Sequence, residues 1–138
     1  MTAIFADTFY WVALTNVKDS AHEQAKDFSR SLSAVSFVTT EPILVEYVNY
    51  FAGWGRDFRL MASANASGIL SSSILQVLPL TAELFRAGVD LYAARPDKGY
   101  SLTDCFSMMT MRQQGLTDVL TNDQHFEQEG FRALFRFG

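Results

Sequence analysis

The feature that most constrains the fold of this chain is an alternation of short apolar runs with longer stretches of helical periodicity. Apolar runs bounded by turn-forming or capping residues predict strands, and they lie at 3–6, 35–39, 74–80, 117–121 and 133–137. Amphipathic or capped stretches predict helices, and they lie at 8–14, 20–33, 40–53, 56–71, 81–94 and 101–114. Strands separated by helices predict an α/β fold, with a mainly parallel sheet covered by helices on both faces.

Composition limits the class of protein further. A chain of 138 residues suits a single domain spanning 1–138, and its 49% apolar and 19% charged residues exclude intrinsic disorder. The net charge of −4 argues against a broad basic surface for nucleic acid, although not against a nuclease whose charges are arranged locally. One cysteine, no basic leader and no apolar run near the ~20 residues of a membrane span predict a soluble, cytoplasmic protein.

Four acidic residues fall where the predicted fold would bring them together. Asp7 and Asp123 follow predicted strands, Asp104 lies in the first turn of a predicted helix, and Glu46 lies in the helix after the second strand. Ligands of open parallel sheets bind outside the carboxyl ends of the strands, so these acids are expected to share one rim. Each aspartate also has a local interpretation as a helix cap, and Ser101-x-x-Asp104 resembles a capping box.

Glu46 is the acid that capping does not explain. Its neighbours at helical spacing are uncharged, and the surrounding helix is apolar nearly all round, which predicts that it is buried. A buried carboxylate requires compensation by a distant arginine, a proton or a metal cation. Of these, only a metal also explains why three further acids gather nearby.

The other candidate ligands support a hard cation. Carboxylates without a His or Cys cluster select Mg²⁺ or Mn²⁺, and an acidic pocket with one or two such ions is an arrangement used for phosphodiester cleavage. We expect His22 to lie on a solvated helix face and Cys105 to be a small core residue. His125 follows Asp123 closely, so it has two interpretations, a role in its loop or a contact with the site.

Aromatic and basic side chains suggest less specific roles. The aromatic residues after Glu46 fit either the core or an apolar surface for a partner: they are Tyr47, Tyr50, Phe51 and Trp54. Three arginines are candidates for an RNA path by position only, with surface solvation as the alternative: Arg56, Arg59 and Arg112. Apolar residues at helical spacing predict an inward face for the helix at 81–94: Leu84, Phe85, Leu91 and Tyr92.

At this point the sequence resembles the PIN-domain family, and in particular its single-domain VapC-type toxins. The resemblance rests on four segments whose order and spacing match across the chain: Ala6-Asp7-Thr8-Phe9-Tyr10-Trp11, Leu44-Val45-Glu46, Ser101-Leu102-Thr103-Asp104-Cys105 and Leu120-Thr121-Asn122-Asp123-Gln124-His125-Phe126.

The resemblance implies a three-layer α/β/α sandwich and a Mg²⁺- or Mn²⁺-dependent endoribonuclease with one or two ions. Asp7, Glu46, Asp104 and Asp123 match the family's acidic quartet, and Thr121 matches its polar residue at a strand end. It further implies the toxin of a type II toxin–antitoxin pair, which forms a homodimer and is silenced by a small antitoxin. The antitoxin's C-terminal segment would lie along the toxin and reach the acidic pocket with a basic side chain.

Other functions remain as alternatives. A PIN-like nuclease of RNA processing would need no antitoxin, and a non-catalytic α/β binding module would use the acids only as caps. A receiver-type phosphate acceptor is disfavoured because it would want two neighbouring acids after the first strand and a late lysine, and no lysine follows Lys98. A haloacid-dehalogenase-type phosphatase would want a second aspartate where Phe9 stands.

Overall fold

The computed structural model describes residues 2–30 and 35–136 of the chain, and its centre is a five-stranded sheet. The strands lie in the order β3-β2-β1-β4-β5, and each neighbouring pair is parallel. Their bounds are β1 Thr2–Ala6, β2 Val35–Thr40, β3 Leu75–Leu78, β4 Asp118–Leu120 and β5 Arg132–Ala133. The predicted α/β class and its parallel sheet are therefore confirmed.

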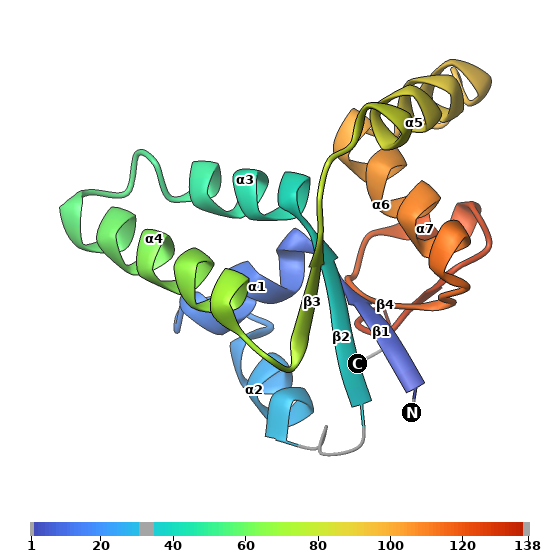
Figure 1. The fold of residues 1–138 in the computed structure, drawn as a ribbon. Coiled ribbons are helices and arrows are strands. Elements are labelled where there is room, and N and C mark those ends of the chain that lie inside the picture. Colours follow the sequence, from blue (N-terminus) through green and yellow to red (C-terminus); the bar gives the residue numbers. More distant parts are fainter. Residues whose placement is uncertain (1, 31–34, 137–138) are drawn as a thin grey trace.

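Helices cover both faces of this sheet (Figure 1). On one side lie α1 Thr8–Thr15, α2 His22–Arg30, α3 Glu41–Tyr50 and α4 Arg56–Ser71. On the other lie α5 Ala82–Ala94, α6 Leu102–Gln114 and α7 Gln124–Gln128. The result is the predicted three-layer sandwich. Among the described residues, no helix combines the length and apolar character that a membrane crossing requires.

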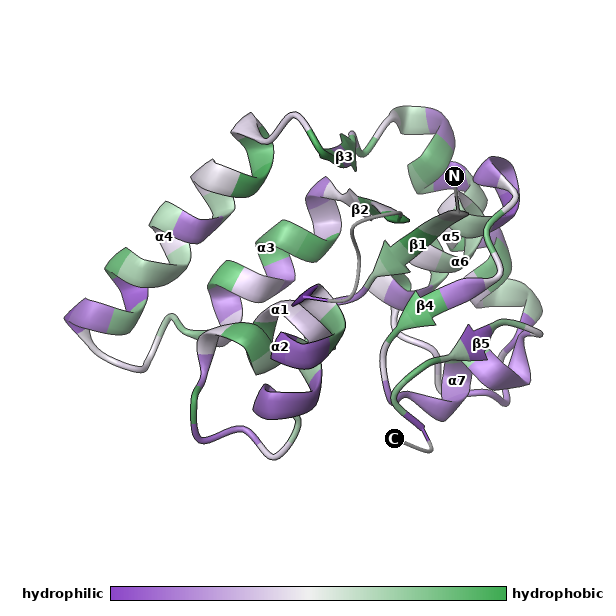
Figure 2. Cartoon of the chain, turned by 90° about the horizontal axis from the view of Figure 1, so that it is seen from below, coloured by the Kyte–Doolittle hydropathy of each residue, from purple (hydrophilic) through white to green (hydrophobic). Residues whose placement is uncertain are grey.

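The core is built on the central strands and the inner sides of the helices. Figure 2 shows hydrophobic residues concentrated along β1 and β4, while α2 and α7 carry many hydrophilic ones. Phe5, Val119 and Leu120 are fully buried, as expected for parallel strands covered on both faces. Local signals mark two of the helix ends: Thr81 caps α5 through the Leu84 N–H, and Gly115 takes a left-handed conformation (φ 69°) after α6.

Several local predictions were wrong. The last strand is Arg132–Ala133, so the strand predicted at 133–137 is confirmed only at Ala133. Residues 134–136 form a turn instead, and residue 137 lies outside the described part of the chain. Phe85 and Tyr92 are 48% and 54% exposed, because the buried side of α5 is formed by Leu84, Gly88 and Leu91.

The strand order creates a switch point beside β1. The chain runs from β1 outward through β2 and β3, then returns to place β4 and β5 on the other side of β1. At such a reversal the connections leave β1 and β4 in opposite directions, which opens a crevice at the carboxyl ends of these two strands. Asp7 follows β1 and Thr121 follows β4, so both lie at this crevice.

Candidate active site

Asp7 and Thr121 form the buried floor of the site. Asp7 occupies the N-cap position of α1, yet its Oδ2 accepts a 2.8 Å hydrogen bond from the Thr121 hydroxyl. Thr121 is fully buried, and its oxygen also accepts from the Asp123 backbone N–H at 3.2 Å. One threonine therefore connects the end of β1 to the turn that carries Asp123.

Asp104 and Asp123 are held by the capping interactions that the sequence predicts. Asp104 Oδ2 accepts from the Ser101 N–H at 3.1 Å, and Ser101 Oγ accepts from the Asp104 N–H at 2.9 Å, which completes the capping box of α6. Asp123 caps α7 by accepting from the His125 N–H at 2.9 Å. Capping does not exclude a second role, since each carboxylate has further lone pairs available.

Glu46 reaches the same place by a route the sequence did not predict. The side chain is exposed, so the expectation of a buried carboxylate on an all-round apolar helix was wrong. The physical reason is that α3 buries one side only, through Pro42, Ile43, Leu44 and Tyr47, and leaves Glu46 on the open side. There its Oε1 accepts a hydrogen bond from the Thr8 hydroxyl at the start of α1.

These residues line one pocket of about 710 Å³, which we call the acidic pocket. Asp7, Glu46, Asp104, Thr121 and Asp123 all lie on its wall, so the structure brings together every residue of the predicted site. The remaining lining residues are Thr8, Phe9, Gly99, Ser101, Asn122, Gln124, His125 and Arg136.

Burial and like charges set the electrostatics of the acidic pocket. Burial is the main cause that raises the pKa of Asp7 from 3.8 to about 7, the Thr121 hydrogen bond opposes it, and Asp104 and Glu46 raise it further. Burial also raises the pKa of Asp104, and the nearby Asp123 carboxylate adds to this effect. Asp7 thus carries the desolvation cost that the sequence interpretation assigned to Glu46.

The donor set fits a divalent cation. Three ligand atoms lie within 4.8 Å of one another, one from each of Asp104, Asp123 and His125. Asp7 is 7% exposed and faces other carboxylates, so a cation would offset both the desolvation and the repulsion that disfavour its charged form. Carboxylate-rich pockets of this kind select hard cations with oxygen ligands.

Two polar lining residues have no sequence signal that places them in the acidic pocket. They are Thr8, which donates to Glu46, and Arg136, whose guanidinium donates to Glu127 at 2.8 Å. His125 lies at the start of α7 and lines the acidic pocket, in agreement with the second of its two interpretations. Its position just after Asp123 in the chain is the signal for this contact.

The remaining predicted side chains lie elsewhere. Arg112 pairs with Glu129, Arg59 donates to the Ala52 carbonyl at 2.9 Å, and Arg56 lies beside Asp57 on the surface. His22 is buried, with Nδ1 2.7 Å from the Ala13 carbonyl oxygen, so its predicted place on a solvated face was wrong. Cys105 is a buried core residue, as predicted.

A parallel sheet with an acidic pocket at its switch point is typical of α/β domains that bind a metal ion there. Comparison with known proteins identifies the family. The PIN domain model matches residues 4–131. The chain therefore belongs to the PIN domain family, as the four sequence segments predicted.

Individual relatives agree with this assignment. The chain is 29% identical over 128 residues to the 23S rRNA-specific endonuclease VapC20 of Mycobacterium tuberculosis, covering 93% of this chain and 95% of that protein. The crystal structure of VapC20, a Sarcin-Ricin loop cleaving toxin, superposes with a TM-score of 0.83 at 27% identity, over 93% of this chain and 95% of that one.

More distant structures share the fold. VapBC2 from Rickettsia felis, bound to a DNA fragment from its promoter, matches with a TM-score of 0.67 at 13% identity, over 96% of this chain and 97% of that one. FitAcB from Neisseria gonorrhoeae matches with a TM-score of 0.65 at 17% identity, over 94% and 95% of the two chains.

Proposed function

We propose that this protein is a divalent-metal-dependent endoribonuclease that hydrolyses RNA phosphodiester bonds and acts as the toxin of a type II toxin–antitoxin pair. The single observation that carries the proposal is the convergence of Asp7, Glu46, Asp104 and Asp123 on one pocket at the switch point of the sheet. The similarity to VapC20, an endonuclease specific for 23S rRNA, supports RNA as the substrate.

The burial of each acidic side chain suggests its role in metal binding. Asp7 and Asp104, the more buried pair, would hold Mg²⁺ or Mn²⁺ directly, while Glu46 and Asp123 would act through water or a second ion. When bound, the metal would neutralise the phosphate and make a water molecule more acidic. Thr121 would keep the Asp7 carboxylate oriented through its 2.8 Å hydrogen bond, and Thr8 would do the same for Glu46.

A cleavage assay with matched variants tests this function. Purified protein is incubated with ribosomal RNA, with Mg²⁺ or Mn²⁺ and with EDTA, beside the variants Asp7→Asn and Asp104→Asn. We expect metal-dependent cleavage to fall at least about 100-fold in each variant. Each substitution removes a carboxylate that would hold the cation, and the cation would neutralise the phosphate during cleavage. Asp57→Asn, on an exposed side chain of α4, is the control that should keep full activity. Equal cleavage by the wild type and both site variants would refute the proposal.

An antitoxin segment fits the groove between α1, α3 and α4. Apolar side chains such as Trp11, Leu14 and Met61 line this groove of about 550 Å³. Tyr47 also lines it, and Tyr47 is the neighbour of Glu46 on α3. A helix bound there would lie beside the acidic pocket, so that a following basic side chain could enter it. Co-expression with the protein encoded next to this gene, followed by co-purification, is the direct test of this partner.

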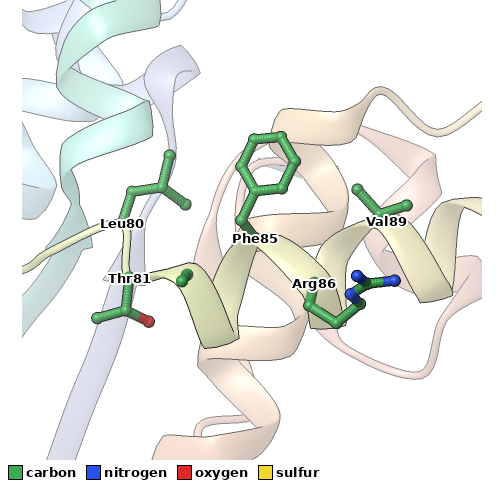
Figure 3. A pocket seen from close by; sticks show the side chains of 6 residues that line it. Leu80, Thr81, Phe85, Arg86 and Val89 are labelled. Atoms are coloured by element: carbon green, nitrogen blue, oxygen red, sulfur yellow. The ribbon is translucent and has the colours of Figure 1, made fainter.

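A homodimer fits the outer side of α5. Phe85 and Val89 project there beside Leu80 and line a hollow of about 510 Å³ (Figure 3). Tyr92, one turn further along α5, is 54% exposed, and exposed apolar side chains on one helix favour association. Light scattering on the wild type and on Phe85→Arg tests this surface, with a dimer expected to become a monomer. The proposed RNA substrate and antitoxin both favour a cytoplasmic location for the protein.

A further inference from the structure

His125 stands where two of the acids approach each other most closely. Its Nδ1 lies 3.3 Å from Asp123 Oδ1 and 3.5 Å from Asp104 Oδ2. The three residues come from different places, the first turn of α6, the cap of α7 and the first turn of α7, and yet direct their donor atoms to one point.

The Nδ1 atom is buried and lacks a hydrogen-bond partner within the described part of the chain. Its contacts with Asp104 and Asp123 lack hydrogen-bond geometry. Nδ1 therefore points, without a hydrogen bond, toward the same place as the carboxylate oxygens of these two acids. An imidazole nitrogen in this position can bind a metal ion through its lone pair.

Neighbouring groups fix the orientation of this ring. Tyr100 meets it edge to face, with the ring centroids 5.3 Å apart. The backbone of Gly99 lies beside the opposite nitrogen, since a Cβ on Gly99 would stand 3.8 Å from Nε2. The His125 N–H is bound to Asp123 Oδ1 at 2.9 Å, which holds the start of α7 against the acid. Nδ1 is therefore kept facing Asp104 and Asp123.

The distances match those between ligands of one cation. Two donors at right angles on metal bonds of about 2.1 Å lie roughly 3.0 Å apart, and donors at the tetrahedral angle lie roughly 3.4 Å apart. The observed distances of 3.3 Å and 3.5 Å require only small adjustments to close around an ion.

We propose that His125 is a metal ligand of this site: through Nδ1, beside Asp104 and Asp123, it binds the second ion that the acidic pocket would hold next to the ion on Asp7 and Asp104. The inference rests on the proposed metal-dependent function and extends it to the choice of ion. Imidazole nitrogen binds transition-metal ions better than Mg²⁺, which strongly prefers oxygen. His125 therefore biases the site toward Mn²⁺ and similar ions over Mg²⁺.

Electron spin-echo spectroscopy of the Mn²⁺-loaded protein tests the bond itself, independently of catalysis. A directly bound imidazole gives a ¹⁴N modulation, and protein grown with ¹⁵N-histidine should replace it with the ¹⁵N pattern. Two variants assign the signal: His125→Phe keeps a ring against Tyr100 but has no nitrogen, and His125→Gln keeps polarity. Gln124→Ala, an exposed neighbour that also lines the acidic pocket, is the matched control.

We expect the nitrogen signal in the wild type and in Gln124→Ala, and its loss in both His125 variants. Calorimetry should show Mn²⁺ affinity reduced at least about 10-fold by the loss of the ligand, with a smaller reduction for Mg²⁺. Bound Mn²⁺ without histidine modulation would overturn this inference and leave the proposed function intact. No Mn²⁺ binding to the wild type, with or without RNA, would overturn both.

Discussion

Replacement of Asp7 by asparagine should stabilise the metal-free protein at neutral and alkaline pH, although it should abolish RNA cleavage. Asp7 is 7% exposed. Burial, with Asp104 and Glu46 adding to it, raises the pKa of its carboxyl from 3.8 to about 7 in the folded protein. Asparagine keeps the shape and can still accept the Thr121 hydrogen bond, but it carries no charge that has to be desolvated.

The direction and size of the effect follow from proton linkage. Between pH 3.8 and about 7 the folded protein keeps a proton on Asp7 that the unfolded chain has lost. This favourable contribution to folding is complete below pH 3.8, falls as the pH rises and is lost above about 7. The two pKa values correspond to roughly 4 kcal/mol, because a tenfold change in proton affinity is worth about 1.4 kcal/mol. Asp7→Asn should therefore be more stable than the wild type by about 2–4 kcal/mol near pH 8.

Urea unfolding in EDTA over a pH series measures this difference. The two proteins should have similar free energies of unfolding at about pH 4, and these free energies should diverge as the pH rises. Asp57→Asn serves as the control, because the Asp57 side chain is 93% exposed and its removal should leave the pH profile parallel to that of the wild type. A variant that is equally or less stable than the wild type at alkaline pH would refute the argument from burial.

Further predictions concern packing and one ion-pair cluster. Gly88→Ala should destabilise the fold by roughly 1–3 kcal/mol, because the new Cβ would stand 2.3 Å from a ring carbon of Phe106. Gly68→Ala, which meets nothing within 4 Å on α4, should stabilise it by up to about 1 kcal/mol, and thermal unfolding compares the two. Glu129→Gln should cost about 2 kcal/mol, because the Glu129 side chain is 4% exposed and accepts from Arg95 at 2.9 Å and 3.0 Å. Burial acts to raise the pKa of Glu129, but the hydrogen bonds that its carboxylate accepts have the larger combined effect, so its pKa is lowered in the folded protein. The wild type should therefore lose the stabilisation by Glu129 as the pH falls into the acid range, and the Gln variant should not.

The fold was predictable because its local signals agree with one another. The helix over 56–71 was predicted with its observed bounds, since the glycines before it and the loss of periodicity after it mark both ends. Burial on individual helices was less predictable. Phe85 and Tyr92 lie at the helical spacing expected of core residues, but they are exposed. The close approach of α5 to α6 at Gly88 turns a different side of α5 inward. That approach depends on tertiary packing, which periodicity does not contain.

The site was predictable to the extent that topology determines it. Asp7, Thr121 and Asp123 follow neighbouring parallel strands, so their convergence follows from the rule for carboxyl ends. The environment of each acid did not follow. Glu46 proved exposed and Asp7 buried, because exposure at the rim depends on how α1 and α3 pack rather than on the composition of either helix.

The charge of the whole protein is consistent with a site that accepts phosphate only when a cation is present. Without Asp7, Glu46, Asp104 and Asp123, the fifteen acids fall to eleven and equal the eleven Lys and Arg residues. By this formal count the excess negative charge can be assigned to the acidic pocket, where carboxylates repel an RNA phosphate. Arg136 lines the same pocket but is paired with Glu127. Affinity for RNA should consequently depend on divalent cations more steeply than on the concentration of monovalent salt, which is the reverse of proteins that bind through a basic surface.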